Sequence, residues 1–264
     1  MEVAVLLGQL LAVGQRDVRE PGAEVAHQPL ALEAGRHAGA HLGGRLLVFH
    51  RKYHGRALAC GHGGVSVVGV EDYPASAAPW PGAIEWSRGE LRRYLDAVAD
   101  LDPSVPTVCT QWTVSGLTAH LAATFRRFGD MLERGRAGSM RPPFAPEELS
   151  GENLRAVREF TGDPVSALDV AAGSFLDAVR SPEELMPHQR GPIPVALQVM
   201  FGLNELAVHH DDLAPATGVR YRPGNKIEVA LAGMYDAVFD LPGGDDPWFR
   251  LLRATGREPE PDSR

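Results

Sequence analysis

The spacing of apolar residues along the chain changes character near residue 86. Before this point the chain is rich in glycine, histidine and proline and shows little sustained helical or strand periodicity. After it, apolar residues recur at helical spacing in several separate stretches, as they do in helices that bury one face. No stretch there alternates apolar and polar residues like a half-buried strand, so the pattern predicts an all-α fold.

Start and stop signals bound five predicted helices. Ser87 and Glu90 have capping-box spacing, which predicts a first helix from Ser87 to about Asp100. Thr113 or Ser115 is the predicted N-cap of a second helix, which should end just before Gly135. The other helices are predicted to begin at Asp163-Pro164, to run from Val195 to about Leu213, and to run from Ile227 to about Leu241.

These signals divide the chain into three regions. Residues 1–85 are predicted to be an extension without fixed structure, and residues 86–241 an antiparallel four-helix bundle. Residues 242–264, rich in glycine, aspartate and proline, are predicted to be a loose tail.

Composition narrows the class of partner and the compartment. The 264 residues carry 26 basic and 34 acidic side chains, a net charge of −8, which argues against binding to nucleic acid or to an anionic membrane surface. No apolar run is long enough to cross a bilayer. The expected partner is therefore a small molecule or another protein. Two cysteines in a chain of this length fit a reducing compartment, so we expect a cytoplasmic protein.

A glutamate and a histidine in the fourth predicted helix have the spacing of metal ligands. Glu205 and His209 are four residues apart, so their side chains leave the helix within roughly 40° of each other, about one turn apart. His120, at the edge of the apolar face of the second helix, is the candidate third ligand. Two histidines and one glutamate form the ligand set of a catalytic zinc site, which keeps a fourth position open. The alternative is a local surface pair, Glu205 with His209, and a core histidine at 120.

Neighbouring residues are assigned lesser roles. His210 is rotated by about 100° from His209, so it cannot share its coordination direction. Asp212 could accept a hydrogen bond from His209, although a carboxylate near a helix end is more often exposed. Cys109 is expected to pack in a linker rather than to act as a nucleophile. The histidines before residue 86 are interpreted as surface groups rather than as a metal site.

Three segments resemble one known family. They are Leu91–Asp96, Val108–Leu121 with its Trp-Thr-Val and His-Leu sequences, and Asn204–Leu213 with its Glu-x-x-x-His-x-x-Asp pattern. Together they resemble the metal-binding domain of mycothiol-dependent maleylpyruvate isomerases, within the DinB-like superfamily. The family's metal ligands fall on His120, Glu205 and His209. The chain departs from the family pattern at Asp211, where an aromatic residue is usual.

The resemblance implies a DinB-like four-helix bundle, a divalent ion such as zinc, and mycothiol as the thiol co-substrate. We therefore expect an enzyme that activates a low-molecular-weight thiol for transfer or addition to a small electrophile, as an S-transferase or an isomerase-like enzyme. The alternative is a non-catalytic metal-binding or ligand-binding helical module with a regulatory role. A metal-free hydrolase has little support, because the chain has no Gly-x-Ser-x-Gly motif and no P-loop.

Overall fold

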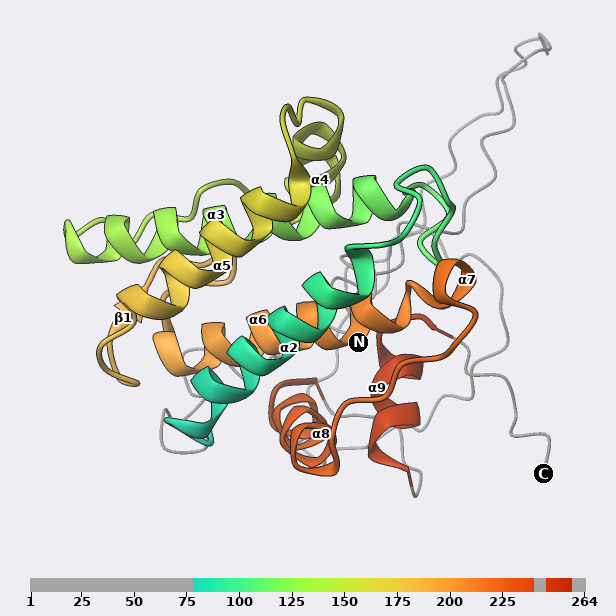
Figure 1. Ribbon diagram of the computed structural model, residues 1–264. Helices are drawn as coiled ribbons and strands as arrows, with labels where there is room; N and C mark the ends of the chain where they lie inside the picture. The colour runs from blue at the N-terminus through green and yellow to red at the C-terminus, as the bar shows by residue number, and fades with distance from the viewer. Residues whose placement is uncertain (1–77, 240–245, 258–264) are drawn as a thin grey trace, which may run out of the picture. The chain divides into compact units, whose positions relative to one another are not determined.

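The computed structural model describes residues 78–239 and 246–257 (Figure 1). The predicted extension up to residue 77, with its histidines, lies outside the described residues. So does the start of the predicted tail at 242–245. Within the described part the chain is helical apart from two-residue strands and loops, as the all-α prediction requires.

Four long helices supply most of the packing. They are α2 (Gly82–Val98), α3 (Val114–Arg136), α5 (Pro164–Ala178) and α6 (Val195–Asp211). Helix α3 packs against α5 and α6, and α2 packs against the same two helices. The shorter elements are η3 (Pro146–Glu148), α4 (Leu149–Arg158), β1 (Leu185–Met186), β2 (Ile193–Pro194), α7 (Ala214–Thr217), α8 (Asn225–Phe239) and α9 (Pro247–Ala254).

Helix α6 is the most deeply buried element. Every residue from Val195 to His209 is buried, which its nearly continuous apolar sequence explains. Helix α3 approaches it closely at Gly202, where an added Cβ would lie 3.0 Å from the Phe125 ring. The side chains of α6 that face α3 therefore lie close to that helix and away from water.

Two of the predicted helix starts are confirmed by cap geometry. The Thr113 side chain accepts a hydrogen bond from the Gly116 amide at the start of α3. The Asp163 carboxylate accepts from the amides of Val165 and Ser166 at the start of α5. Both caps satisfy amide groups that have no partner inside their own helix.

The capping box predicted at Ser87 is wrong. Helix α2 already begins at Gly82, and Ser87 lies inside it, where its hydroxyl donates to the Ala83 carbonyl at 2.8 Å. Glu90 is buried and contacts Arg93 and Tyr221 instead of an amide group at a helix start. The pattern was correct for a helix but misplaced its first residue.

Gly135 also has a different role from the predicted stop signal. It lies within the last turn of α3, and an added Cβ there would stand 2.8 Å from the Leu185 carbonyl oxygen. Its small size permits close contact with β1, and the helix continues to Arg136.

Three α-helices were absent from the prediction: α4, α9 and the short α7. Helix α4 packs against α3, in a region interpreted as a proline-rich loop. Helix α9 lies within the predicted loose tail, yet Trp248, Leu251 and Leu252 are buried. Its start, Asp246-Pro247, repeats the signal of α5, and the Asp246 carboxylate accepts from two amides. No helix in the described part of the chain has the length and apolar character needed to cross a membrane.

Candidate metal centre

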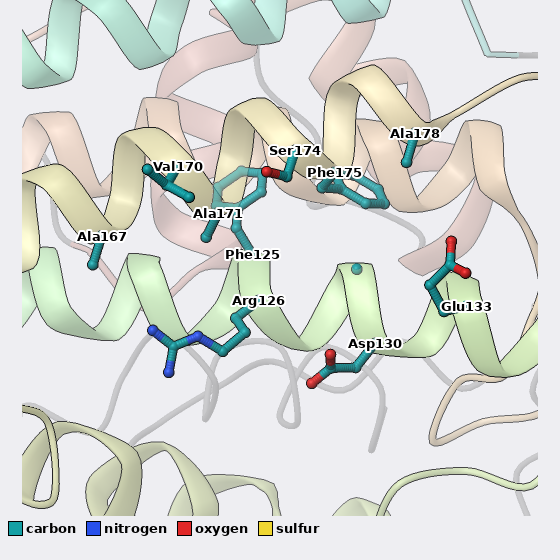
Figure 2. A pocket seen from close by; sticks show the side chains of 11 residues that line it. Phe125, Arg126, Asp130, Glu133, Ala167, Val170, Ala171, Ser174, Phe175 and Ala178 are labelled. Atoms are coloured by element: carbon teal, nitrogen blue, oxygen red, sulfur yellow. The ribbon is translucent and has the colours of Figure 1, made fainter.

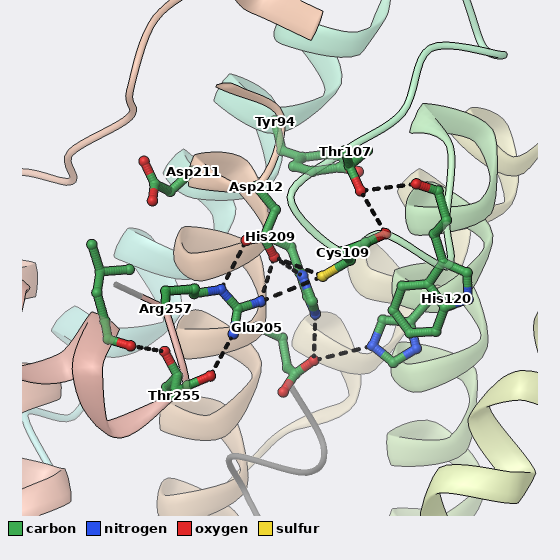
Figure 3. A network of polar contacts seen from close by, with 12 residues as sticks. Tyr94, Thr107, Cys109, His120, Glu205, His209, Asp211, Asp212, Thr255 and Arg257 are labelled. Atoms are coloured by element: carbon green, nitrogen blue, oxygen red, sulfur yellow. Dashed lines mark hydrogen bonds and ion pairs between the residues drawn. The ribbon is translucent and has the colours of Figure 1, made fainter. Parts of the chain in front are cut away.

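The structure brings together the three residues proposed as metal ligands. His120 comes from α3, whereas Glu205 and His209 lie one turn apart on α6 (Figure 3). The Oε2 atom of Glu205 lies 3.4 Å from Nε2 of His120 and 3.4 Å from Nε2 of His209. One ligand atom from each residue lies within 4.8 Å of the others. The two helices thus aim two imidazole nitrogens and one carboxylate oxygen at one point.

The surroundings of the three residues exclude water and fix their orientation. His120, Glu205 and His209 are all buried, with exposed fractions of 4% or less. The Trp112 ring stacks on His120 with ring centres 4.4 Å apart. Trp112 is held in place by a tight turn, in which its amide donates to the Cys109 carbonyl at 2.7 Å. The imidazole of His120 therefore has few alternative orientations.

The other nitrogen of His209 faces a second cluster. Asp212 Oδ2 lies 2.7 Å from His209 Nδ1, and a carboxylate can only accept, so Nδ1 donates the hydrogen bond. The Cys109 thiol donates to the same oxygen at 3.2 Å. Arg257 donates to both oxygens of Asp212, with Nε 2.8 Å from Oδ1. Asp212 thus acts as the acceptor that orients His209, one of the two roles considered from the sequence.

Cys109, His209 and Asp212 also meet the distance criterion for a metal site. This set differs because Arg257 already supplies it with a positive charge: Nη2 contacts Asp212 Oδ2 and lies 3.6 Å from Cys109 Sγ. A metal ion at this position would have to compete with a buried guanidinium. We therefore assign the candidate metal centre to the Nε2 side of His209.

The ionisation of each residue in the centre depends on its burial and on the charge of its neighbours. Burial lowers the pKa of His120 to about 4, although contact with Glu205 acts in the opposite direction. Burial opposes ionisation of Glu205, but the two histidines at 3.4 Å favour the carboxylate more strongly and lower its pKa to about 2. Burial also opposes a charge on His209, but Asp212, Cys109 and Glu205 outweigh it and raise the pKa well above its ordinary value. A cation that binds Nε2 of His209 must replace a proton there.

The donor set fits a divalent cation. Glu205 is a buried carboxylate whose only ion-pair partners among the described residues are the two imidazoles. The Nε2 atom of His209 is buried and has no hydrogen-bond partner within residues 78–239 and 246–257. Because Asp212 accepts from Nδ1, the lone pair of a neutral His209 is at Nε2, which faces Glu205. These are the groups and the orientation that a zinc-like ion requires.

The next two residues of α6 point elsewhere. His210 stacks on Tyr221, with ring centres 3.6 Å apart and planes within 10°. Asp211 pairs with Arg220 and accepts from the Tyr221 amide at 3.0 Å. The predicted rotation of His210 away from the metal direction is thus seen in the structure.

A surface pocket between α3 and α5 is a separate feature. It has a volume of about 430 Å³ and contains none of the three candidate ligands (Figure 2). Small residues of α5, such as Ala167 and Ala171, form one wall, and Arg126 and Asp130 of α3 lie on the other.

Sequence reasoning missed two residues that support the centre. Trp112 lay in a segment used for the resemblance but received no role, and its position one residue before the N-cap Thr113 is the only sequence signal for it. Arg257 lay in the predicted tail. Its contact with Asp212 joins residues 45 positions apart, which no local pattern reveals.

Comparisons with known proteins identify the domain. Residues 85–214 match the family model described as the mycothiol maleylpyruvate isomerase N-terminal domain. Comparison with curated proteins finds no match, and comparison with solved structures finds none either. The matched segment contains His120, Glu205 and His209, whereas α8, α9 and Arg257 lie beyond it. Residues 85–214 of this chain therefore belong to the mycothiol maleylpyruvate isomerase N-terminal domain family, as the resemblance in its helical segments predicts.

Proposed function

We propose that this protein is a divalent-metal-dependent enzyme that uses a low-molecular-weight thiol, mycothiol, against a small electrophile. The observation that carries the proposal is the convergence of His120, Glu205 and His209 within 4.8 Å in a buried position. Three ligands leave a fourth position for an exchangeable group, as in catalytic zinc sites. Family membership of residues 85–214 supports mycothiol as the thiol.

Each residue of the centre has a distinct role in this proposal. His120, Glu205 and His209 would hold a zinc-like ion, in a bundle formed by α2, α3, α5 and α6. A divalent cation at such a position lowers the pKa of a coordinating thiol, so that the thiolate is available at neutral pH. Asp212 keeps a proton on Nδ1 of His209, which directs Nε2 towards Glu205. Trp112 covers one face of His120 and keeps water from it.

The reaction we propose is S-transfer or addition. In transfer, the thiol sulfur bonds to the electrophilic carbon, the bond from that carbon to the leaving group breaks, and the thiol proton is released with the leaving group. In addition, the sulfur bonds to one carbon of an activated double bond, the π bond breaks, and the adjacent carbon takes the proton. The low cysteine content suits a reducing compartment, so we also propose a cytoplasmic location.

Zinc binding to variants of the full chain tests the ligand set. We expect His120→Ala, Glu205→Gln and His209→Ala each to weaken zinc affinity by on the order of 10²-fold or more, measured by competition with a chelating dye. His210→Ala is the matched control, because it removes the adjacent imidazole, which faces Tyr221. Equal zinc affinity in all four variants would exclude this ligand set.

Thiol consumption then tests the activity. Zinc-loaded protein should consume mycothiol when electrophiles such as a haloalkane or an activated alkene are supplied, and Glu205→Gln should not. Stoichiometric zinc without thiol consumption would favour the alternative, a metal-binding module without catalysis.

A further inference from the structure

Arg127 of α3 is a cation that the proposed metal chemistry does not use. It lies partly buried on the side of α3 that packs against α4. Its Nη2 donates to Oδ1 of Asn153 at 2.9 Å, and its guanidinium lies 5.0 Å from the centre of the Phe144 ring. Within the described residues no carboxylate lies at ion-pair distance from Arg127, and most of its N–H groups have no acceptor.

Asn153 of α4 adds a second donor with no acceptor. The residue is 1% exposed, and its Oδ1 atom is already occupied by Arg127. Its Nδ2 atom is buried and has no hydrogen-bond partner in the described part of the chain. Buried amide groups are rarely left in this state unless a ligand or water completes them. An arginine and an asparagine thus present unused N–H donors side by side.

The register of α3 places this pair near the metal centre. His120, Thr124 and Arg127 are spaced four and then three residues apart, so they share one face of the helix. Helical side chains lean towards the N-terminus, which brings the guanidinium back along α3 in the direction of His120. Between them, the Thr124 hydroxyl is buried and has no partner among the described residues.

The charges around Arg127 do not neutralise it. Burial lowers its pKa, and the nearby charges of Glu152 and Glu205 only partly offset that effect. Glu152 is itself paired with Arg155. Glu205 is held by the two histidines. The position therefore retains positive potential that is available to an anion.

We propose that Arg127 and Asn153 form an anion site for the carboxylate group of a small molecule. A planar carboxylate accepts two parallel hydrogen bonds, so it can take one from the guanidinium and one from the Asn153 amide. Thr124 offers a further hydroxyl on the side towards His120. The site is distinct from the three candidate metal ligands and does not depend on the proposed function.

Succinate binding to the full-length chain without added metal tests this site. Calorimetric titration at constant ionic strength should show binding to the parent protein, and Arg127→Gln should weaken it at least about tenfold. The matched control is Arg126→Gln, which removes the neighbouring charge on the side of the α3–α5 pocket and should leave the affinity unchanged. Equal weakening in both variants would show a general charge effect and overturn the proposal.

Asn153→Asp provides a second variant that does not depend on the stability of Arg127→Gln. The new carboxylate would pair with Arg127 internally and occupy the site. We expect the melting temperature to rise and succinate binding to fall at least about tenfold. Undiminished succinate binding by Asn153→Asp would exclude the site. Tighter binding of inorganic phosphate than of succinate would exclude the carboxylate assignment.

Zinc titration of the same variants separates this inference from the proposed function. Arg127→Gln should bind zinc like the parent, and His209→Ala should bind succinate like the parent. If the parent protein binds succinate but not zinc, only the proposed function is contradicted; if it binds zinc but not succinate, only the anion site is.

Discussion

His209 has a different environment at each of its ring nitrogens, and the comparison shows what makes a group of ligand-type residues able to take a metal. On the Nε2 side lie Glu205 and His120, and on the Nδ1 side lie Asp212 and Cys109 (Figure 3). Both groups are buried and both meet the same distance criterion. Their residue types alone do not distinguish them.

Charge balance distinguishes the two sides. Asp212 receives two hydrogen bonds from the guanidinium of Arg257, so its charge is neutralised by the chain itself. Glu205 has no lysine or arginine partner among the described residues. A buried carboxylate that lacks a permanent cation can accept one from solution, whereas one already paired gains little by doing so. The chain thus supplies a cation on one side of His209 and leaves room for one on the other.

The largest expected effect comes from removing the internal cation. Arg257→Met leaves Asp212 buried without its positive partner, so we expect the free energy of unfolding to fall by about 3–5 kcal/mol. Urea denaturation measures this change. Arg253→Met, on the exposed side of α9, is the control and should have little effect. Similar losses from both variants would mean that the ion pair between Arg257 and Asp212 makes no specific contribution to the free energy of unfolding.

Asp212→Asn should act on the metal side through His209. An amide can turn its NH₂ group towards Nδ1, which no longer secures the proton there, so zinc affinity should fall by about 10–100-fold. Asp211→Asn removes the adjacent carboxylate, which binds Arg220 instead, and should leave zinc affinity unchanged. If Asp212→Asn binds zinc as tightly as the parent, Asp212 does not orient His209.

A weaker α9 should lower stability with little effect on the metal side. Asp246→Ala removes the side-chain cap of α9, and a lost N-cap costs about 1 kcal/mol. Urea unfolding should show this loss, whereas zinc affinity should be retained because Arg257 and Asp212 still pair. A large loss of zinc affinity would show that the metal centre depends on α9 beyond this one contact.

The smallest effect is expected at Cys109. Its thiol lies on the side that Arg257 occupies, so Cys109→Ala should bind zinc as the parent does. Cobalt provides a sensitive measurement, because thiolate coordination adds an intense charge-transfer band in the near ultraviolet. If the parent shows such a band and Cys109→Ala does not, the metal binds on the Nδ1 side of His209.

The sequence was sufficient for the parts of the fold that local signals control. The caps at Thr113 and Asp163 are set by side chains within three residues of the amides they satisfy. The pairing of Glu205 with His209 follows from one helical turn. The position of His120 required more, namely that α3 and α6 pack face to face, and the resemblance supported this where periodicity alone could not.

The missed features depend on contacts between distant segments. Arg257 meets Asp212 only because the C-terminal segment folds back onto the end of α6. Asn153 lies on a short helix among prolines, and only its contact with Arg127 reveals its role. Helix α9 is the exception, because Asp246-Pro247 carries the same start signal that located α5. This start signal was overlooked because the segment around it is rich in glycine, aspartate and proline.

Gly202 has a consequence for the metal centre although it offers no ligand atom. Its hydrogen faces the Phe125 ring, and even a methyl group there would crowd the ring carbons at 3.0 and 3.2 Å. His120 lies on α3 and Glu205 on α6, so the distance between these ligands depends on how closely the two helices approach at Gly202. A relative that keeps all three ligands but carries a bulkier residue at this position should hold a larger ion, or none.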